Sequence, residues 1–159
     1  MESNHSRSTW HINVALLLPV FVYLVLVQFY AYNFPFLDDY ATILQHSLLS
    51  NTQQISNWFT PHNEHLHLVL KAAVSFDLWL FGTINLVHLI GFGAVIFLLF
   101  FWILLKLQTK DGLPWVWLIP LPFLLFQPSY WGTITWSTTC LHNFPGLLFS
   151  LLALLLWNS

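Results

Sequence analysis

Charged side chains are scarce in this chain of 159 residues. Lys, Arg, Asp and Glu together make up 6% of it, whereas 57% of the residues are hydrophobic and 18% are aromatic. A soluble domain usually carries about 25% charged residues, because its surface has to be solvated by water. The shortage of charge excludes an ordinary soluble globule and predicts an all-α membrane protein.

Basic residues and cysteine are also few. Four Lys and Arg stand against six Asp and Glu, which gives a net charge of −2 with histidine neutral. The sequence therefore offers no electrostatic basis for binding nucleic acid. Cys140 is the single cysteine, which excludes an intrachain disulfide. Nine Trp and five Tyr fit the aromatic belts of membrane–water interfaces.

The chain does contain long apolar runs, and these predict about three to four transmembrane helices. Residues 12–32 and 85–107 are long enough to cross a hydrocarbon core of about 30 Å. Residues 113–126 and 144–157 are shorter candidate spans. Because the last run falls below the roughly 20 residues that a span needs, we expect the chain to be a piece of a larger helical bundle.

Orientation follows from the few basic residues. Arg7 lies in a polar tail, residues 1–10, and Lys106 and Lys110 follow the second span. The positive-inside rule then places these residues on the cytoplasmic side of the membrane. We therefore expect a cytoplasmic N-terminus and an external loop over residues 33–84.

Part of that external loop is apolar without being a convincing span. Residues 66–82 are interrupted by Lys71 and Asp77, and a charge at mid-membrane costs roughly 2.5–3.5 kcal/mol. We expect this stretch to form an amphipathic helix that lies at the interface or packs against the helical bundle.

Asp38 and Asp39 stand side by side directly after the first span, in FPFLDDYATIL. Paired carboxylates can hold a divalent cation or divide labour, with one acting as a base. Alternatively, an aspartate here caps a helix that starts near residue 40. Asn85 and His88, at the start of the second span, are interpreted as satisfied polar groups at a helix end rather than as ligands.

The stretch WFTPHNEHLHLVLK, residues 58–71, holds several functional side chains. Thr60 followed by Pro61 is typical of a helix start, with Thr as N-cap and Pro at the first helical position. On such a helix Glu64, His67 and Lys71 would share one stripe. That stripe would face either lipid headgroups or a polar cavity.

Histidines in the same stretch raise the question of a metal site. His62, His65 and His67, with Glu64, could converge on an ion, but they lack the i, i+4 spacing of helical zinc ligands. Interfacial histidines that reach toward water and contacts to an anionic phosphate are the alternatives.

The order of these features resembles the N-terminal region of GT-C glycosyltransferases, which are polytopic membrane enzymes that use lipid-phosphate-linked sugars. The family motif is an acidic pair in the first external loop, here Asp38-Asp39. Asn63, Glu64 and His65 also resemble an Asn-Glu-His-Arg segment of uncharacterised bacterial membrane proteins of that type. Leu66 stands where the Arg is expected.

The resemblance implies inverting transfer of a hexosyl group from a polyprenyl-phosphate donor, at the bacterial inner membrane. It implies Asp39 as base or as ligand of a divalent cation, Mg²⁺ or Mn²⁺, with Asp38 as its partner. Glu64, His65 and Lys71 would bind the phosphate of the substrate. The alternative is a small non-enzymatic membrane subunit, such as a transporter or flippase accessory, with membrane lipid as its partner.

Overall fold

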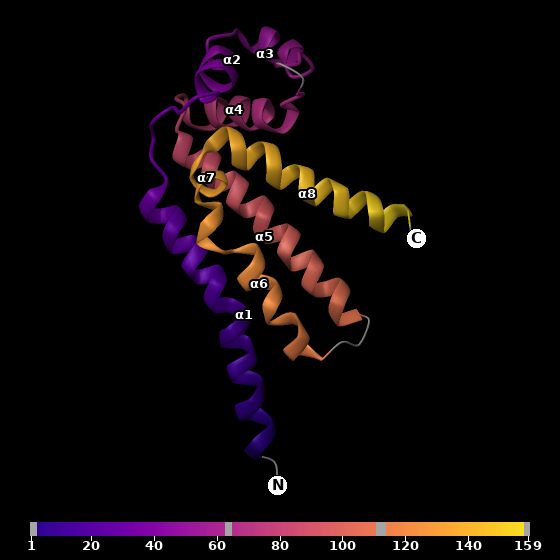
Figure 1. Ribbon diagram of the computed structural model, residues 1–159. Coiled ribbons are helices and arrows are strands. Elements are labelled where there is room, and N and C mark those ends of the chain that lie inside the picture. Colours follow the sequence, from indigo (N-terminus) through magenta and orange to yellow (C-terminus); the bar gives the residue numbers. More distant parts are fainter. Residues whose placement is uncertain (1–2, 63–64, 111–113, 158–159) are drawn as a thin grey trace.

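A computed structural model describes residues 3–62, 65–110 and 114–157 of the chain. Its named elements are helices, and three of them are long: α1 (Ser3–Tyr30), α5 (Leu86–Lys110) and α8 (Ser137–Trp157), shown in Figure 1. Stretches of these three, His11–Tyr30, Leu86–Gln108 and Ser137–Trp157, are long and apolar enough to cross a membrane. The expectation of an all-helical membrane protein is thereby confirmed.

Short helices between α1 and α5 form a layer at one end of the long helices (Figure 1). This cap layer, residues 33–62 and 65–85, contains a π-helix (Tyr40–Leu44), α2 (Gln45–Ser47), α3 (Asn51–Asn57) and α4 (Leu68–Phe81). α4 is 14 residues long, too short to span a bilayer by itself. It ends at Gly82, whose left-handed φ of 72° suits a helix C-terminus.

The segment from 113 to 126 is not a continuous helix. Its described part consists of a 3₁₀ turn (Trp115–Leu118) and α6 (Pro120–Leu125). Proline lacks a main-chain N–H and restricts the residue before it, so Pro114, Pro120 and Pro122 limit helix growth here. A second 3₁₀ turn (Pro128–Tyr130) and α7 (Trp131–Thr135) follow, and α8 begins seven residues before the expected residue 144.

The predicted helix start at Thr60-Pro61 is wrong. The main chains of His62 and His65 pair with each other instead, at N–O distances of 2.9 and 3.0 Å. The helix α4 begins only at Leu68. Consequently His67 and Lys71 do not share a helical stripe, because Lys71 lies in α4 and His67 precedes it. Glu64 lies outside the described residues.

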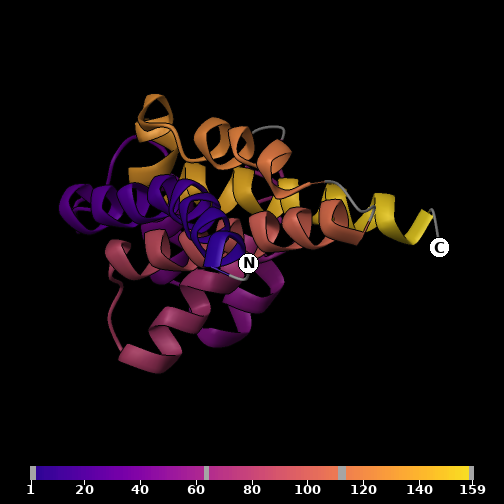
Figure 2. The ribbon, with the colours of Figure 1, turned by 90° about the horizontal axis from the view of Figure 1, so that it is seen from below.

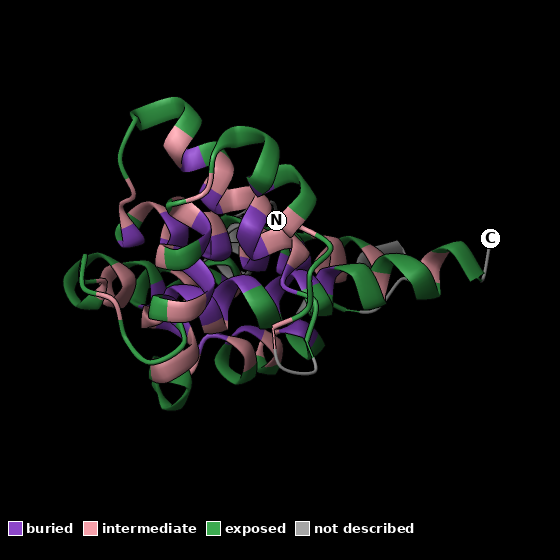
Figure 3. Ribbon diagram, turned by 90° about the horizontal axis from the view of Figure 1, so that it is seen from above, coloured by how far each residue is buried: buried purple, intermediate pink, exposed green. Residues whose placement is uncertain are grey.

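Aromatic rings fill the core between α1, α5, α6 and α8. Phe97 stacks on Phe144 at a centroid distance of 4.3 Å, and Tyr23 and Phe126 pack against Phe97 at 5.8 and 5.0 Å. Buried residues gather centrally, while the far part of α8 is exposed and extends away from the other helices (Figures 2 and 3). The core therefore lies close to the cap layer.

Candidate functional site

Asp39 is almost completely buried, with 1% of its surface exposed, and it accepts five hydrogen bonds. Its Oδ1 receives the Trp136 indole N–H at 3.1 Å, the Ser137 hydroxyl at 2.9 Å, and both the main-chain N–H and the hydroxyl of Thr138. Its Oδ2 receives the Phe36 main-chain N–H at 3.0 Å. The buried carboxylate thus receives donors from its own loop, at Phe36, and from residues 136–138, which lie far along the chain.

These contacts make Asp39 a cap for α8. Ser137 and Thr138 open that helix, and the first N–H groups of a helix have no partner within it. A carboxylate at this end also complements the positive end of the helix dipole. The prediction that an aspartate caps the helix starting near residue 40 is wrong, because Asp39 makes no side-chain cap bond to the π-helix that follows it; it caps the distant α8 instead.

Asp38 has a different environment from its neighbour. Its side chain is exposed, while its main-chain carbonyl accepts the N–H groups of Ala41 and Thr42 and the Thr42 hydroxyl. Leu37, just before the pair, has a left-handed φ of 46°, which is rare for a bulky side chain. This turn separates the two carboxylates, with Asp39 directed inward and Asp38 left outside.

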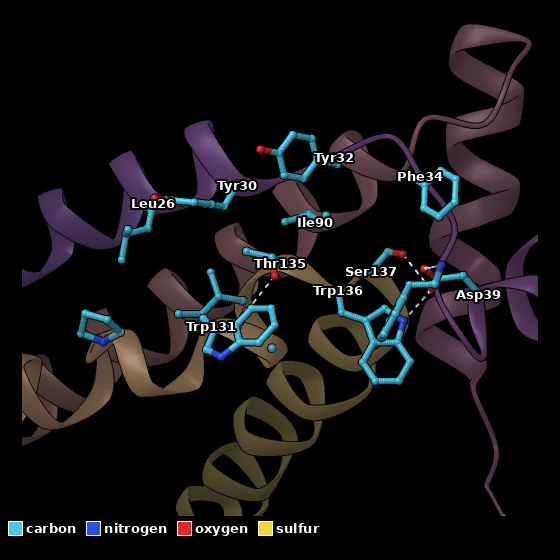
Figure 4. A pocket seen from close by; sticks show the side chains of 14 residues that line it. Leu26, Tyr30, Tyr32, Phe34, Asp39, Ile90, Trp131, Thr135, Trp136 and Ser137 are labelled. Carbon is cyan, nitrogen blue, oxygen red and sulfur yellow. Dashed lines mark hydrogen bonds between the residues drawn. The ribbon is translucent and has the colours of Figure 1, made fainter.

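A cavity of about 720 Å³ lies beside Asp39. In Figure 4, Asp39, Trp136 and Ser137 mark one end of the lining, and Leu26 and Tyr30 of α1 lie toward the other. Most of the lining residues are apolar or aromatic. The complete lining consists of Leu26, Tyr30, Tyr32, Phe34, Phe36, Asp39, Ile90, Pro128, Trp131, Gly132, Ile134, Thr135, Trp136 and Ser137. Its size is within the range of about 300–1,000 Å³ that is typical of small-molecule sites.

Of the predicted phosphate-binding residues, Lys71 and His65 do not line this cavity, and Glu64 lies outside the described residues. Lys71 is buried, and its Nζ donates to the main-chain carbonyls of Asn57 at 2.9 Å and of Thr60. Burial lowers the pKa of its ammonium group. Asn57 is the last residue of α3, and Thr60 follows that helix. The Lys71 ammonium group is therefore a cation at a helix C-terminus. His65 is exposed and does not line the cavity either.

Sequence reasoning missed a buried polar network that joins α2, α3 and α4. His46 contacts the Ser75 hydroxyl through Nε2 at 2.9 Å and the Asn57 amide through Nδ1 at 3.0 Å. The Trp58 indole also donates to Ser75, at 3.2 Å. Burial, and then the charge of Lys71, lowers the pKa of His46. No local pattern signals this network, since its members meet only after the helices pack.

Asp77 is the second buried aspartate, with 0% of its surface exposed. It accepts the main-chain N–H of Asn85 and contacts His88 Nδ1, both at 2.9 Å. The Asn85 side chain in turn accepts the N–H of Val87, and Asn33 accepts that of Leu86. The prediction that Asn85 and His88 are polar groups with satisfied hydrogen bonds at the start of this helix is confirmed. The role of Asp77 as an acceptor at this helix start was not predicted.

Four histidines gather beside α4 and α8: His62, His65, His67 and His142. Burial, and then the neighbouring histidines, lowers the pKa of His67 to about 4. As the side chains stand, no group of three or more His, Cys, Asp or Glu in the described parts of the chain is placed to hold a metal ion.

Comparisons of the chain with protein-family models, with curated proteins and with solved structures found no match. Functional argument therefore starts from the cavity and from the residues around it.

Proposed function

We propose that this membrane protein binds the isoprenoid chain of a polyprenyl-phosphate sugar in the cavity beside Asp39 and takes part in transfer of the sugar. The observation that supports the proposal is the position of an apolar, aromatic cavity between α1 and α7 with Asp39 at one end of it. Such a lining suits a hydrocarbon chain, and polar groups at one end suit its head.

In this proposal the acceptor hydroxyl attacks the anomeric carbon of the sugar, and the bond from that carbon to the phosphate oxygen breaks. The polyprenyl phosphate leaves with the electron pair, and a carboxylate takes the hydroxyl proton. Asp38 is better suited to this step than Asp39, because its side chain is exposed whereas Asp39 Oδ1 already accepts four hydrogen bonds.

The orientation proposed here places the cap layer outside the bacterial inner membrane and the N-terminus of α1 in the cytoplasm. α1 ends and α5 and α8 begin at the cap layer (Figure 1). Lys106, near the other end of α5, then lies on the cytoplasmic side, as the positive-inside rule requires. A Mg²⁺ or Mn²⁺ ion at Asp39 is not needed for the step as written.

Binding is tested by filling the cavity. Gly132 lines it, and a Cβ added there meets nothing within 4 Å, so the larger side chain of Gly132→Leu has an open starting point from which to occupy the cavity. Gly146→Leu is the matched control, because Gly146 also has open space around it but lies in α8 away from the cavity. A photoreactive polyprenyl phosphate should label the wild type and the control about tenfold more than Gly132→Leu, which corresponds to about 1.4 kcal/mol. Equal labelling of all three proteins contradicts the proposal.

A non-enzymatic membrane subunit is the second candidate. The structural role of Asp39 at the start of α8 favours it. If Asp39 only caps α8, the acidic pair has no chemistry to perform. Asp38→Asn separates the two candidates: loss of sugar transfer with labelling retained supports the enzyme, and unchanged behaviour of the variant in a transfer-competent membrane supports the subunit.

A further inference from the structure

Four imidazole rings from two distant parts of the chain lie together. His67 is central, with ring centroids 5.0 Å from His142, 6.1 Å from His62 and 6.2 Å from His65. The rings of His65 and His142 are 5.2 Å apart. The main-chain pairing of His62 with His65 holds these two residues beside each other, and α8 supplies His142.

His67 has an unsatisfied atom within this group. Its side chain is 8% exposed, and its Nδ1 is buried without a hydrogen-bond partner. Buried polar atoms of native proteins nearly always have a partner, so an orphaned ring nitrogen among three further imidazoles indicates a missing ligand.

We propose that His62, His65, His67 and His142 form a binding site for a divalent transition-metal ion such as Zn²⁺. Imidazole nitrogen is a preferred donor for this class of ion, whereas Mg²⁺ and Mn²⁺ prefer oxygen. The site is distinct from the cavity, since none of the four histidines lines it.

Ring spacing agrees with a shared ion. With Zn–N bonds of about 2.0–2.1 Å and tetrahedral geometry, the centroids of two imidazole ligands lie about 5 Å apart. The contacts of His142 with His65 and His67, at 5.2 and 5.0 Å, match this value. The contacts of His62 and His65 with His67, at 6.1 and 6.2 Å, need to shorten by about 1 Å on this geometry.

The nitrogen atoms do not converge as the rings stand, so binding requires some rings to turn. A half-turn of imidazole about the Cβ–Cγ bond leaves the centroid in place and exchanges nitrogen for carbon on the ring edge. His65 and His142 are exposed, which leaves them room to turn. Neutral imidazole is the form that binds metals.

The test is Zn²⁺ titration of the full chain in detergent, read by competition with a chromophoric chelator and by metal content after dialysis. We expect about one Zn²⁺ per chain, and visible absorption typical of tetrahedral Co²⁺ when Co²⁺ replaces it. The variant His65→Ala/His142→Ala removes two exposed ligands and should weaken binding by at least about tenfold. His11→Ala, in α1 and outside the cluster, should bind as the wild type does.

Two results overturn the proposal: a wild type that holds no stoichiometric Zn²⁺, or a double variant that binds as tightly as His11→Ala. Retained secondary structure by circular dichroism shows that the double variant is folded. His142→Asn alone, which changes one exposed side chain, provides the same comparison if the double variant misfolds. Failure of lipid labelling leaves this result unaffected, because the two sites share no residue.

Discussion

The N-termini of α5 and α8 are both held by a buried aspartate, but the two aspartates differ in their distance along the chain. Asp77 lies eight residues before the Asn85 N–H that it accepts, whereas Asp39 lies 99 residues before the Thr138 N–H. The first contact joins neighbouring helices. The second joins the first loop to the last long helix, so the same capping chemistry serves a local turn in one case and the closure of the whole fold in the other.

Asp39→Ala should have the largest effect of the changes considered. It removes the acceptor of five hydrogen bonds and leaves the buried Ser137 hydroxyl and Thr138 main-chain N–H without partners, each at about 1–3 kcal/mol. We expect a loss of about 3–5 kcal/mol in the free energy of unfolding, measured by denaturation in mixed micelles. Asp38→Ala, at the exposed neighbour, is the control and should change stability by less than about 0.5 kcal/mol.

If Asp39→Ala and Asp38→Ala have equal free energies of unfolding, the long-range cap does not stabilise the fold. The distinction drawn between the caps of α5 and α8 is then wrong.

Asp77→Ala should be less damaging, although Asp77 is equally buried. The start of α5 keeps two other acceptors, the side chains of Asn33 and Asn85, so the helix retains part of its cap. We expect a loss of about 2–3 kcal/mol, mainly from the buried Asn85 N–H and from His88. The same denaturation assay decides the order, and an Asp77→Ala variant less stable than Asp39→Ala would reverse it.

Gly93→Ala tests the contact through which the two capped helices meet. A Cβ at Gly93 would lie 2.6 Å from Cys140 Sγ, so α5 and α8 must separate or Cys140 must shift. We expect a loss of about 1–3 kcal/mol, as for other overpacked contacts. Gly91→Ala is the matched control: a Cβ there meets nothing within 4 Å, and alanine favours helix over glycine by about 1 kcal/mol. Equal stability of Gly93→Ala and Gly91→Ala would show that the helices adjust freely.

The smallest expected effect is on the pH dependence of stability, and it arises in the cap layer, which carries both capping aspartates. Burial and the Lys71 charge hold the pKa of His46 below its ordinary value of 6.5. As pH falls below about 6.5, the unfolded chain therefore binds a proton that the folded chain does not, and stability decreases, by at most about 1.4 kcal/mol per pH unit for this one site. His46→Gln should show a weaker pH dependence of unfolding between pH 7 and 5; the same slope as the wild type contradicts this origin.

The membrane helices were predictable from sequence because length and hydropathy decide them locally. The Asn85 cap was predictable for the same reason, since an asparagine directly before an apolar run is a local signal. The partner of Asp39 was not, because nothing near residue 39 indicates a helix start almost 100 residues later. Thr60-Pro61 failed as a helix start for a tertiary reason too: the Thr60 carbonyl accepts the Lys71 ammonium, and His62 pairs with His65.

The separation between Asp39 and Thr138 also has a consequence in time. A ribosome adds about 5–20 residues per second, so about 5–20 s pass between synthesis of Asp39 and synthesis of the N–H that it caps, 99 residues later. Asp77 waits less than about 2 s for Asn85 at that rate. During the longer interval the Asp39 carboxylate has to remain hydrated at the membrane surface. The nascent cap layer thus stays open until α8 arrives, and docking of α8 is the event that removes water from this carboxylate.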